Sequence, residues 1–411
     1  MENKEAISAA IQAQFDQQVD FLQRLVRARS TNPFTPETAT PDVPVEREAA
    51  LVTQHELQRL EFDAQLVGVS SQRPNVLCHI PSAGETKRTL ILTTHLDTVD
   101  ASEHYTRDPW GAQIEQGRLY GVGTADAKAQ ITAFIYALHA LRKAGIELTG
   151  DVTLAFVVDE ETGACSPYGA RYLLEQGLLH GDAAIVGEPG DGKIATAHRG
   201  LYRFRLHMKG EATHTGVSAW EQGRQGRNAI LDMARLAVAL SENPLPASHS
   251  DVFPHRQSVL TFPTLIRGGS GINIVPGSCD AYGDARLLPG LSAEEVKQFL
   301  REQLASLSLE NYSIEDLLVV PAAETNPQAD IIQTLAAAVE MVTGVRPRLE
   351  GSGPACDGWM FTTRGIPTVC GYGVKCGGVH GADEWADLES LRKVTEVYAL
   401  TILYFLHGTI L

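Results

Sequence analysis

The segment Thr89–Val99 limits the possible folds more than any other part of the sequence. It begins with an apolar run, Leu90–Thr94, and continues into His95, Leu96 and Asp97. A run of this kind predicts a strand that is buried on both faces. Residues two apart in a strand point to the same side, so His95 and Asp97 are expected to face one site, with Asp97 accepting the second ring N–H of His95. A metal-binding histidine uses such a partner, because it fixes the tautomer and raises the basicity of the ligand.

A second candidate ligand, Asp126, follows about thirty residues later. After it, apolar residues recur at helical spacing until Gly145 ends the pattern: Ile131, Phe134, Ile135, Leu138 and Leu141. The sequence therefore predicts that Asp126 opens a helix. A carboxylate on a strand-to-helix turn, beside a histidine at a strand end, is a candidate metal site in an open α/β sheet.

Strand and helix patterns alternate over residues 1–198 and again over residues 321–411. Buried strands are predicted at 151–158 and 183–186, and each is followed by acidic residues, Asp159–Glu161 and Glu188. The alternation predicts an α/β fold with a mostly parallel sheet and helices on both faces. Open α/β sheets bind their ligands at the carboxyl ends of the strands, where these acidic residues stand. We interpret the two stretches as the two parts of one catalytic domain.

Residues 199–320 follow a different pattern, which predicts strand, helix, strand, strand, helix and strand. The second of these helices begins at Ser292, with Glu295 three residues on, as in a capping box. The order β-α-β-β-α-β is the ferredoxin-like arrangement. We therefore expect a small ferredoxin-like domain inserted into the catalytic domain.

The composition excludes several classes of protein. The chain has 411 residues, enough for two domains, and its net charge of −16 argues against a nucleic-acid partner. The six cysteines form no C-x-x-C pair, which excludes a zinc finger and predicts a reducing compartment. The polar N-terminal segment lacks the apolar core of a signal peptide, and no run reaches transmembrane length. We expect a cytoplasmic protein without a membrane partner.

Five potential metal ligands stand at or just beyond the predicted strand ends: His95, Asp126, Glu161, Glu188 and His380. Two histidines and three carboxylates suit a two-zinc centre in which one carboxylate bridges the ions. Two metal ions roughly 3.5–4 Å apart can share an activated water and polarise a carbonyl group.

The adjacent carboxylates Glu160 and Glu161 are the most informative pair. They repel each other unless cations or protons intervene. One interpretation is a solvent-exposed acidic turn. In the functional interpretation, one of the two binds a metal ion while its neighbour serves as general base.

These residues lie in motifs by which the sequence resembles the M20 family of metallopeptidases and deacylases. The motifs, in order, are HLDTV (95–99), GVGTADAK (121–128), DEETG (159–163), GEP (187–189), HTG (214–216), NIVPG (273–277), DAR (284–286) and HGADEW (380–385). The resemblance covers nearly the whole chain. It departs from many members after Asp126, where Ala127–Gln130 replaces a glycine-rich start. Packing at that turn, and the substrate pocket, are therefore expected to differ from those of the better-known members.

The resemblance implies how the ligands are shared. His95 and Glu188 would hold one metal ion, Glu161 and His380 would hold the other, and Asp126 would bridge them. The implied cofactor is two Zn²⁺ ions per chain, with Co²⁺ or Mn²⁺ as alternatives that an oxygen-rich site also accepts.

The resemblance also implies catalytic roles outside the ligand set. Asp97 would orient His95, and Glu160 would be the base and proton shuttle. His214, in the small domain, would reach across a homodimer interface and stabilise the oxyanion that forms on the partner's substrate. Taken alone, His214 could equally be an ordinary surface residue.

Three further residues are predicted to bind the substrate. Asn273 and Arg286 match substrate-contacting positions of the family, and the fork of an arginine suits a carboxylate. Arg286 could instead pair structurally with Asp284 or Asp280. The segment Gly351–Gly353 is either a turn or a loop whose backbone amides, including that of Gly353, close over the substrate; we favour the second.

The resemblance favours a metal-dependent hydrolase that cleaves an amide bond next to a carboxylate. The expected activity is that of an N-acyl-amino-acid deacylase of the acetylornithine deacetylase or succinyl-diaminopimelate desuccinylase type, acting on a small molecule with a free carboxylate. A dipeptidase or a glutamate-type carboxypeptidase of the same family would share every catalytic residue. A non-catalytic metal-binding protein that retains the fold is the alternative from another class. A serine hydrolase is not supported, since the sequence has no G-x-S-x-G elbow.

Overall fold

The chain divides into two compact units. The computed structural model describes residues 2–35, 38–82, 84, 88–164 and 167–408. The larger unit combines Met1–His198 with Ala323–Leu411, and the smaller unit is Arg199–Ala322. The chain thus leaves the larger unit once and returns to it.

The larger unit is built on a nine-stranded sheet of order β1-β2-β6-β3-β7-β15-β8-β13, with β14 paired to β8. Its strands are β1 (Ala64–Val67), β2 (Asn75–Ile80), β3 (Thr89–His95), β6 (Asp151–Val157), β7 (Ala183–Gly187), β8 (Ile194–His198), β13 (Ala323–Glu324), β14 (Leu349–Ser352) and β15 (Thr368–Tyr372). The central strands β6, β3, β7 and β15 run parallel. Antiparallel strands follow on both sides of them. The predicted α/β fold with a mostly parallel sheet is confirmed. The sequence did not predict that the strands on both sides of the parallel centre run antiparallel.

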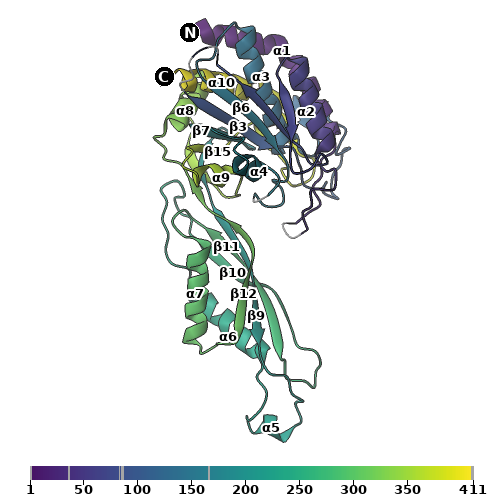
Figure 1. The fold of residues 1–411 in the computed structure, drawn as a ribbon, viewed down its shortest axis with the longest axis vertical. Helices are drawn as coiled ribbons and strands as arrows, with labels where there is room; N and C mark the ends of the chain where they lie inside the picture. The colour runs from purple at the N-terminus through teal and green to yellow at the C-terminus, as the bar shows by residue number, and fades with distance from the viewer. Residues whose placement is uncertain (1, 36–37, 83, 85–87, 165–166, 409–411) are drawn as a thin grey trace. The chain divides into compact units, whose positions relative to one another are not determined.

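Helices cover both faces of this sheet (Figure 1). They are α1 (Glu2–Arg27), α2 (Arg47–Arg59), α3 (Ala129–Lys143), α4 (Ala170–Glu175), α8 (Asp330–Thr343), α9 (Gly358–Thr362) and α10 (Leu388–His407). Because strand side chains alternate, Leu90 and Leu92 of β3 join the core formed with α1, α3 and α10. Ile91 instead joins the core formed with α4 and α9. None of the helices in the described part of the chain combines the length and apolarity needed to span a membrane.

A second, small sheet in the larger unit has the order β16-β17-β5-β4. Its strands are β4 (Gln113–Glu115), β5 (Arg118–Tyr120), β16 (Cys376–Gly377) and β17 (Trp385–Asp387). The pairing of β17 with β5 brings the segment after Tyr120 next to the segment before Trp385. Strands of two or three residues carry too little periodicity for the sequence to predict, yet this sheet positions Asp126 and His380.

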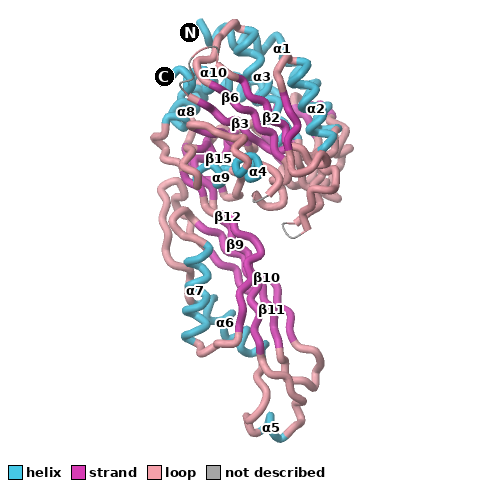
Figure 2. The backbone as a smooth tube through the Cα atoms, viewed as in Figure 1, coloured by secondary structure: helices cyan, strands magenta, loops and turns pink. Residues whose placement is uncertain are grey.

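The smaller unit is a four-stranded antiparallel sheet with two helices packed on one face (Figure 2). Its elements are β9 (Gly200–Lys209), α5 (Ser218–Glu221), α6 (Ala229–Glu242), β10 (Val259–Gly268), β11 (Ser278–Leu287), α7 (Ala293–Ser306) and β12 (Tyr312–Val320). The strand order β10-β11-β9-β12 is the ferredoxin-like topology that the sequence predicts. The capping box is present: Ser292 Oγ accepts the Glu295 N–H at 3.2 Å, and Glu295 Oε2 accepts the Ser292 N–H at 2.7 Å.

His139 makes the stability of the larger unit depend on pH. Its ring lies against Gln14, with Nδ1 2.5 Å from Gln14 Oε1, and burial together with the charges of Arg142 and Lys143 lowers its pKa to about 4. The unfolded chain, with a histidine pKa near 6.5, takes up the proton first as the pH falls, so folding stability is lost below about pH 6.5. We expect protonation of this residue to lower the free energy of unfolding by about 2 kcal/mol between pH 7 and pH 5.

The measurement is the free energy of unfolding at both pH values for the wild type and His139→Gln. The variant should show a pH dependence that is weaker by about that amount. Equal pH dependences in the two proteins would contradict the assignment.

Candidate metal centre

Each of the five predicted ligands lies in the larger unit, on a segment that leaves a strand. His95 ends β3, Glu161 follows β6 and Glu188 follows β7. These three strands are parallel neighbours, so their carboxyl ends meet at one edge of the sheet. Asp126 and His380 come from segments next to the small sheet.

Asp126 lies at the centre of the cluster. Its Oδ1 is 3.0 Å from His95 Nε2, and its Oδ2 is 3.2 Å from His380 Nε2. Glu161 Oε1 lies 3.2 Å from the same His380 nitrogen. Two groups of side chains result, His95–Asp126–Glu188 and Asp126–Glu161–His380, and within each the ligand atoms lie within 4.8 Å of one another. One carboxylate is shared between two three-residue groups, with one oxygen facing each histidine.

The residues of both groups fit metal ions. Imidazole nitrogens and carboxylate oxygens are the donors that zinc and similar ions take. Glu188 Oε1 is buried and accepts no hydrogen bond from any residue that the structure describes. A buried oxygen without a donor is costly, and a cation beside His95 and Asp126 would satisfy it.

Electrostatics give the same indication. Burial, followed by the charges of neighbouring carboxylates, raises the pKa of Glu188 well above its ordinary value. Hydrogen bonds to Asp126 and Glu161 raise the pKa of His380 to about 10. The site thus favours positive charge, which protons or metal ions can supply.

Asp126 does not open a helix, contrary to the sequence prediction. It lies in a kinked turn, η1 (Thr124–Lys128), where Asp126 and Ala127 have non-helical φ/ψ angles, and α3 begins only at Ala129. The buried carboxylate of Glu384 accepts the N–H groups of Gly123 (2.9 Å), Ala125 (2.8 Å) and Asp126 (3.1 Å). Glu384 therefore holds the turn that presents Asp126.

Asp97 acts differently from the prediction. His95 Nδ1 lies 2.9 Å from the backbone oxygen of Asp97, whereas the nearer carboxylate oxygen is 3.6 Å away. The carboxylate instead accepts the N–H groups of Glu160 at 3.1 Å and Glu161 at 3.0 Å. Asp97 thus contacts His95 through its main chain and fixes the acidic segment through its side chain.

Glu160 is buried rather than exposed, which argues against a solvated acidic turn. Burial raises its pKa well above the ordinary value; His95 opposes this, while Glu188 and Asp357 add to it. A carboxyl group of raised pKa, next to candidate metal ligands, has the properties of a general base that must later give up its proton.

The smaller unit holds three of the predicted residues. His214 and Asn273 are exposed neighbours, with Asn273 Nδ2 3.4 Å from His214 Nε2. Arg286 lies near the far end of β11 and pairs with Asp284, its Nε 2.7 Å from Oδ1, as the structural alternative proposed. The ten residues of β11 span roughly 30 Å, so the structure does not bring Arg286 to His214 within one chain.

The segment Gly351–Gly353 is largely not a loop. Gly351 and Ser352 belong to β14, which pairs with β8, and only Gly353 lies beyond the strand. Among the residues that the structure describes, no hydrogen bond ties Gly353 to the metal-ligand cluster, so its role stays a prediction.

Several residues that shape the site were missed by the sequence reasoning. Glu384 lies inside the HGADEW motif and Asn32 in a loop, but their partners are 65 to 261 residues away in the chain. Asp357, a buried carboxylate that raises the pKa of Glu160 and Glu188, was missed as well. No local pattern marks these three residues: Glu384 stands next to Asp383, Asn32 stands between Thr31 and Pro33, and Asp357 stands between Cys356 and Gly358.

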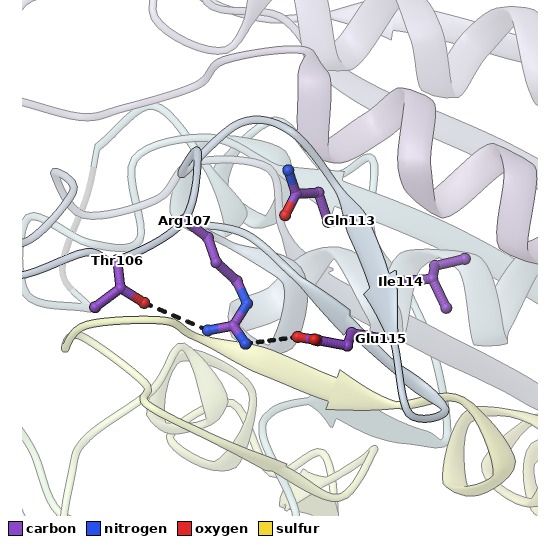
Figure 3. Close-up of a pocket in the computed structure, with 5 residues that line it drawn as sticks. All are labelled: Thr106, Arg107, Gln113, Ile114 and Glu115. Carbon is purple, nitrogen blue, oxygen red and sulfur yellow. Dashed lines mark hydrogen bonds and ion pairs between the residues drawn. The ribbon is translucent and has the colours of Figure 1, made fainter.

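A pocket elsewhere in the larger unit contains none of the predicted site residues (Figure 3). It is lined by Thr106, Arg107, Gln113, Ile114 and Glu115. Its arginine is already paired, with Glu115 at 2.6 Å and with Asp383 at 3.3 Å. Asp383 also accepts the backbone N–H of Thr106 at 2.9 Å, so this region anchors the segment that carries His380.

The fold and the shared-carboxylate cluster together define a metal-dependent peptidase or related hydrolase, and the comparison with family models names the family. The model of peptidase family M20/M25/M40 matches residues 91–404. The chain therefore belongs to this family, as the motifs indicated.

Solved structures share the fold over nearly the whole chain. Aminopeptidase PepT from Bacillus cereus is 20% identical, with a TM-score of 0.75, and the match covers 96% of this chain and 99% of that one. The di-peptidase Dug1p from Saccharomyces cerevisiae is 14% identical, with a TM-score of 0.73 and 99% of each chain covered. A Bacillus subtilis protein described as a dinuclear metal binding peptidase from the M20 family is 15% identical, with a TM-score of 0.69, and the match covers 96% of this chain and 99% of that one.

Proposed function

We propose that the chain is a two-metal hydrolase that cleaves an amide bond next to a carboxylate. The observation that carries the proposal is the position of Asp126 between His95 and His380, with Glu188 and Glu161 completing two ligand groups. Two Zn²⁺ ions are the proposed cofactor, with Co²⁺ or Mn²⁺ as alternatives. When bound, such ions activate water and polarise the carbonyl group that is attacked.

The chain's own residues then move the protons and position the ligands. Glu160 takes a proton from the attacking water as the new C–O bond forms, and delivers it to the amine nitrogen as the C–N bond breaks. Its raised pKa suits both steps. Asp97, through the Glu160 and Glu161 N–H groups, holds the base next to a ligand.

The substrate we propose first is an N-acyl amino acid, and the second is a short peptide with a free carboxylate. Arg286, whose Nε also bonds to Asp284, is the residue proposed to bind the substrate carboxylate in either case. Burial and the nearby charges of Arg256 and Arg286 lower the pKa of Arg199, so three guanidinium groups gather at this end of the smaller unit. Because solved structures of similar fold include an aminopeptidase and a di-peptidase, peptides should be tested alongside N-acyl amino acids.

A mass-spectrometric hydrolysis screen tests the function. Purified protein is incubated with N-acetyl, N-succinyl and N-formyl amino acids and with dipeptides, with added zinc and with chelator. Cleavage of one class that chelator abolishes supports the proposal and selects the substrate. Absence of cleavage in a protein that binds two metal ions would favour a binding protein that retains the fold. The cytoplasmic location stays a prediction.

We also propose a homodimer formed through the smaller unit. β10 is an edge strand, and its Ile266 lies opposite Ala281, a core residue on the helix-covered face. Ile266 is 48% exposed, and Leu231 and Val238 of α6 are 59% and 56% exposed. An unpaired edge beside exposed apolar side chains is a typical interface for a second chain.

The variant Leu231→Glu/Ile266→Glu should have the mass of one chain, whereas the wild type should have that of two. Sedimentation provides the measurement. Because both positions are exposed in the single chain, the variant should still fold, and its unfolding temperature should fall only by the stabilisation that dimer formation gives the wild type. A wild type that is monomeric and fully active would contradict the dimer.

His214 is proposed to stabilise the oxyanion in the partner's site. Its substitution by alanine should lower kcat by about 10²–10³-fold. Mixing His214→Ala with Glu160→Gln, each inactive alone, should restore up to about a quarter of the activity, because half of the random dimers would contain one complete site. No recovery after verified subunit exchange would count against a role across the interface.

A further inference from the structure

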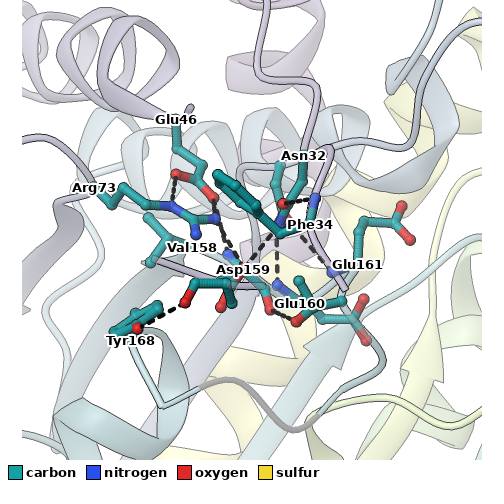
Figure 4. Close-up of polar contacts among 12 residues, drawn as sticks. Asn32, Phe34, Glu46, Arg73, Val158, Asp159, Glu160, Glu161 and Tyr168 are labelled. Atoms are coloured by element: carbon teal, nitrogen blue, oxygen red, sulfur yellow. Dashed lines mark hydrogen bonds and ion pairs between the residues drawn. The ribbon is translucent and has the colours of Figure 1, made fainter. Parts of the chain in front are cut away.

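The segment Asp159–Glu161 is held by buried charged residues that lie outside the metal-ligand groups (Figure 4). The side chains of Glu46, Arg73 and Asp159 are all fully buried. Arg73 donates from Nε to Glu46 Oε2 at 2.7 Å and from NH2 to Asp159 Oδ1 at 2.9 Å. Its guanidinium group also lies over the ring of Phe34, 5.6 Å from the centroid.

A continuous series of hydrogen bonds leads from Arg73 to the proposed base. Asn32 Nδ2 donates to Asp159 Oδ1 at 2.8 Å and to Asp97 Oδ2 at 2.9 Å. The Asp97 carboxylate in turn accepts the N–H groups of Glu160 and Glu161. A change at Arg73 can therefore reach both glutamates through side chains that are packed and buried.

Asp159 needs this support because of its own backbone. Its φ of +65° lies in the left-handed region, which is uncommon and costly for a residue other than glycine. Glu46 Oε1 accepts the Asp159 N–H at 3.1 Å, while Arg73 binds the Asp159 carboxylate. Main chain and side chain of Asp159 are thus both fixed by the same ion pair.

The same residues resemble a third metal site in which the protein supplies the cation. Glu46, Asp97 and Asp159 each place an oxygen within 4.8 Å of the others, as the ligands of the two metal-ligand groups do. Here the guanidinium group of Arg73 contacts two of the three. Its planar fork sets the directions of its hydrogen bonds, which a lysine ammonium group cannot do.

We propose that Arg73 is a positioning residue for Glu160 and Glu161, acting through Asp159, Asn32 and Asp97. The inference rests on the proposed function and adds a residue to it. Stability alone is a poor explanation for this cluster, since a buried ion pair often contributes little compared with apolar residues of the same size. Figure 4 shows the side chains of Glu160 and Glu161 on the other side of the segment from Glu46 and Arg73, so Arg73 acts from behind the site.

The test is Arg73→Lys, compared with Arg59→Lys as the matched control. Arg59 also makes two hydrogen bonds to one buried glutamate, Glu56, at 2.6 and 3.2 Å, and a third to Tyr136, and neither partner belongs to the site. Arg73→Lys should weaken zinc binding to the apoprotein about 10–100-fold in a competition titration, and should lower kcat to a similar extent with little change in KM. Arg59→Lys should leave the zinc affinity and kcat at the wild-type level.

Wild-type zinc affinity and kcat in a folded Arg73→Lys protein would overturn the proposal. If that variant does not fold, Asn32→Ala breaks the same connection between Asp159 and Asp97, and unchanged zinc affinity there overturns it equally. A wild-type protein that binds no zinc would instead overturn the proposed function, and this inference with it.

Discussion

Glu160→Gln should abolish turnover while both metal ions stay bound. The amide cannot take a proton from water, and the loss of general-base catalysis typically lowers kcat by about 10²–10⁴-fold. The substitution keeps the shape of the side chain, and the Glu160 N–H that binds Asp97 is unchanged. Because burial already raises the pKa of this carboxyl group, a neutral amide there should not lower the unfolding temperature.

The adjacent substitution Glu161→Gln is the matched control for this prediction. It makes the same chemical change one residue further on, at a side chain 3.2 Å from His380. It should lower the metal content, whereas Glu160→Gln should keep two ions per chain. The measurements are kcat on the substrate found in the screen and metal content by elemental mass spectrometry. A Glu160→Gln protein with wild-type kcat would remove Glu160 from the mechanism.

The parts of the site that the sequence predicted are those set by local patterns. His95, Glu161 and Glu188 each follow a buried apolar run, and such runs predict parallel strands whose carboxyl ends meet. The ferredoxin-like order of the smaller unit was also predictable from local patterns, since β11 alternates clearly between buried and more exposed residues and Ser292 caps its helix in the usual way.

The parts that the sequence did not predict depend on contacts between distant segments. The apolar periodicity of α3 predicts that the helix starts near Asp126. In the structure, Glu384 accepts the N–H groups of Ala125 and Asp126, and the turn Thr124–Lys128 is not part of the helix. Asp97 is two residues from His95, which suggested a side-chain contact. The Asp97 carboxylate instead accepts the N–H groups of Glu160 and Glu161, which lie more than sixty residues away in the sequence and would otherwise lack a hydrogen-bond partner. No spacing rule connects Arg73 to Asp159 either.

Asp126→Ala should abolish the stabilisation of the folded protein by metal ions at both ligand groups. Asp126 is the one residue common to the two groups, with Oδ1 facing His95 and Oδ2 facing His380. An ion that binds only the folded state stabilises it by about 4 kcal/mol when present at 1,000 times its dissociation constant. The wild type should therefore unfold at a higher temperature with zinc than with chelator, and Asp126→Ala should show little difference between the two conditions, with kcat at background.

Asp182→Ala provides the control for that experiment. Asp182 precedes β7 at the opposite end of the strand from Glu188, and its carboxylate accepts the Thr89 N–H at 2.8 Å. Its loss should lower the unfolding temperature slightly, but equally with zinc and with chelator, because no ligand is touched. If Asp126→Ala instead kept the full zinc-dependent increase, one carboxylate would not be shared by two ions, and the two-metal assignment would have to be replaced by a single site built from one of the two groups.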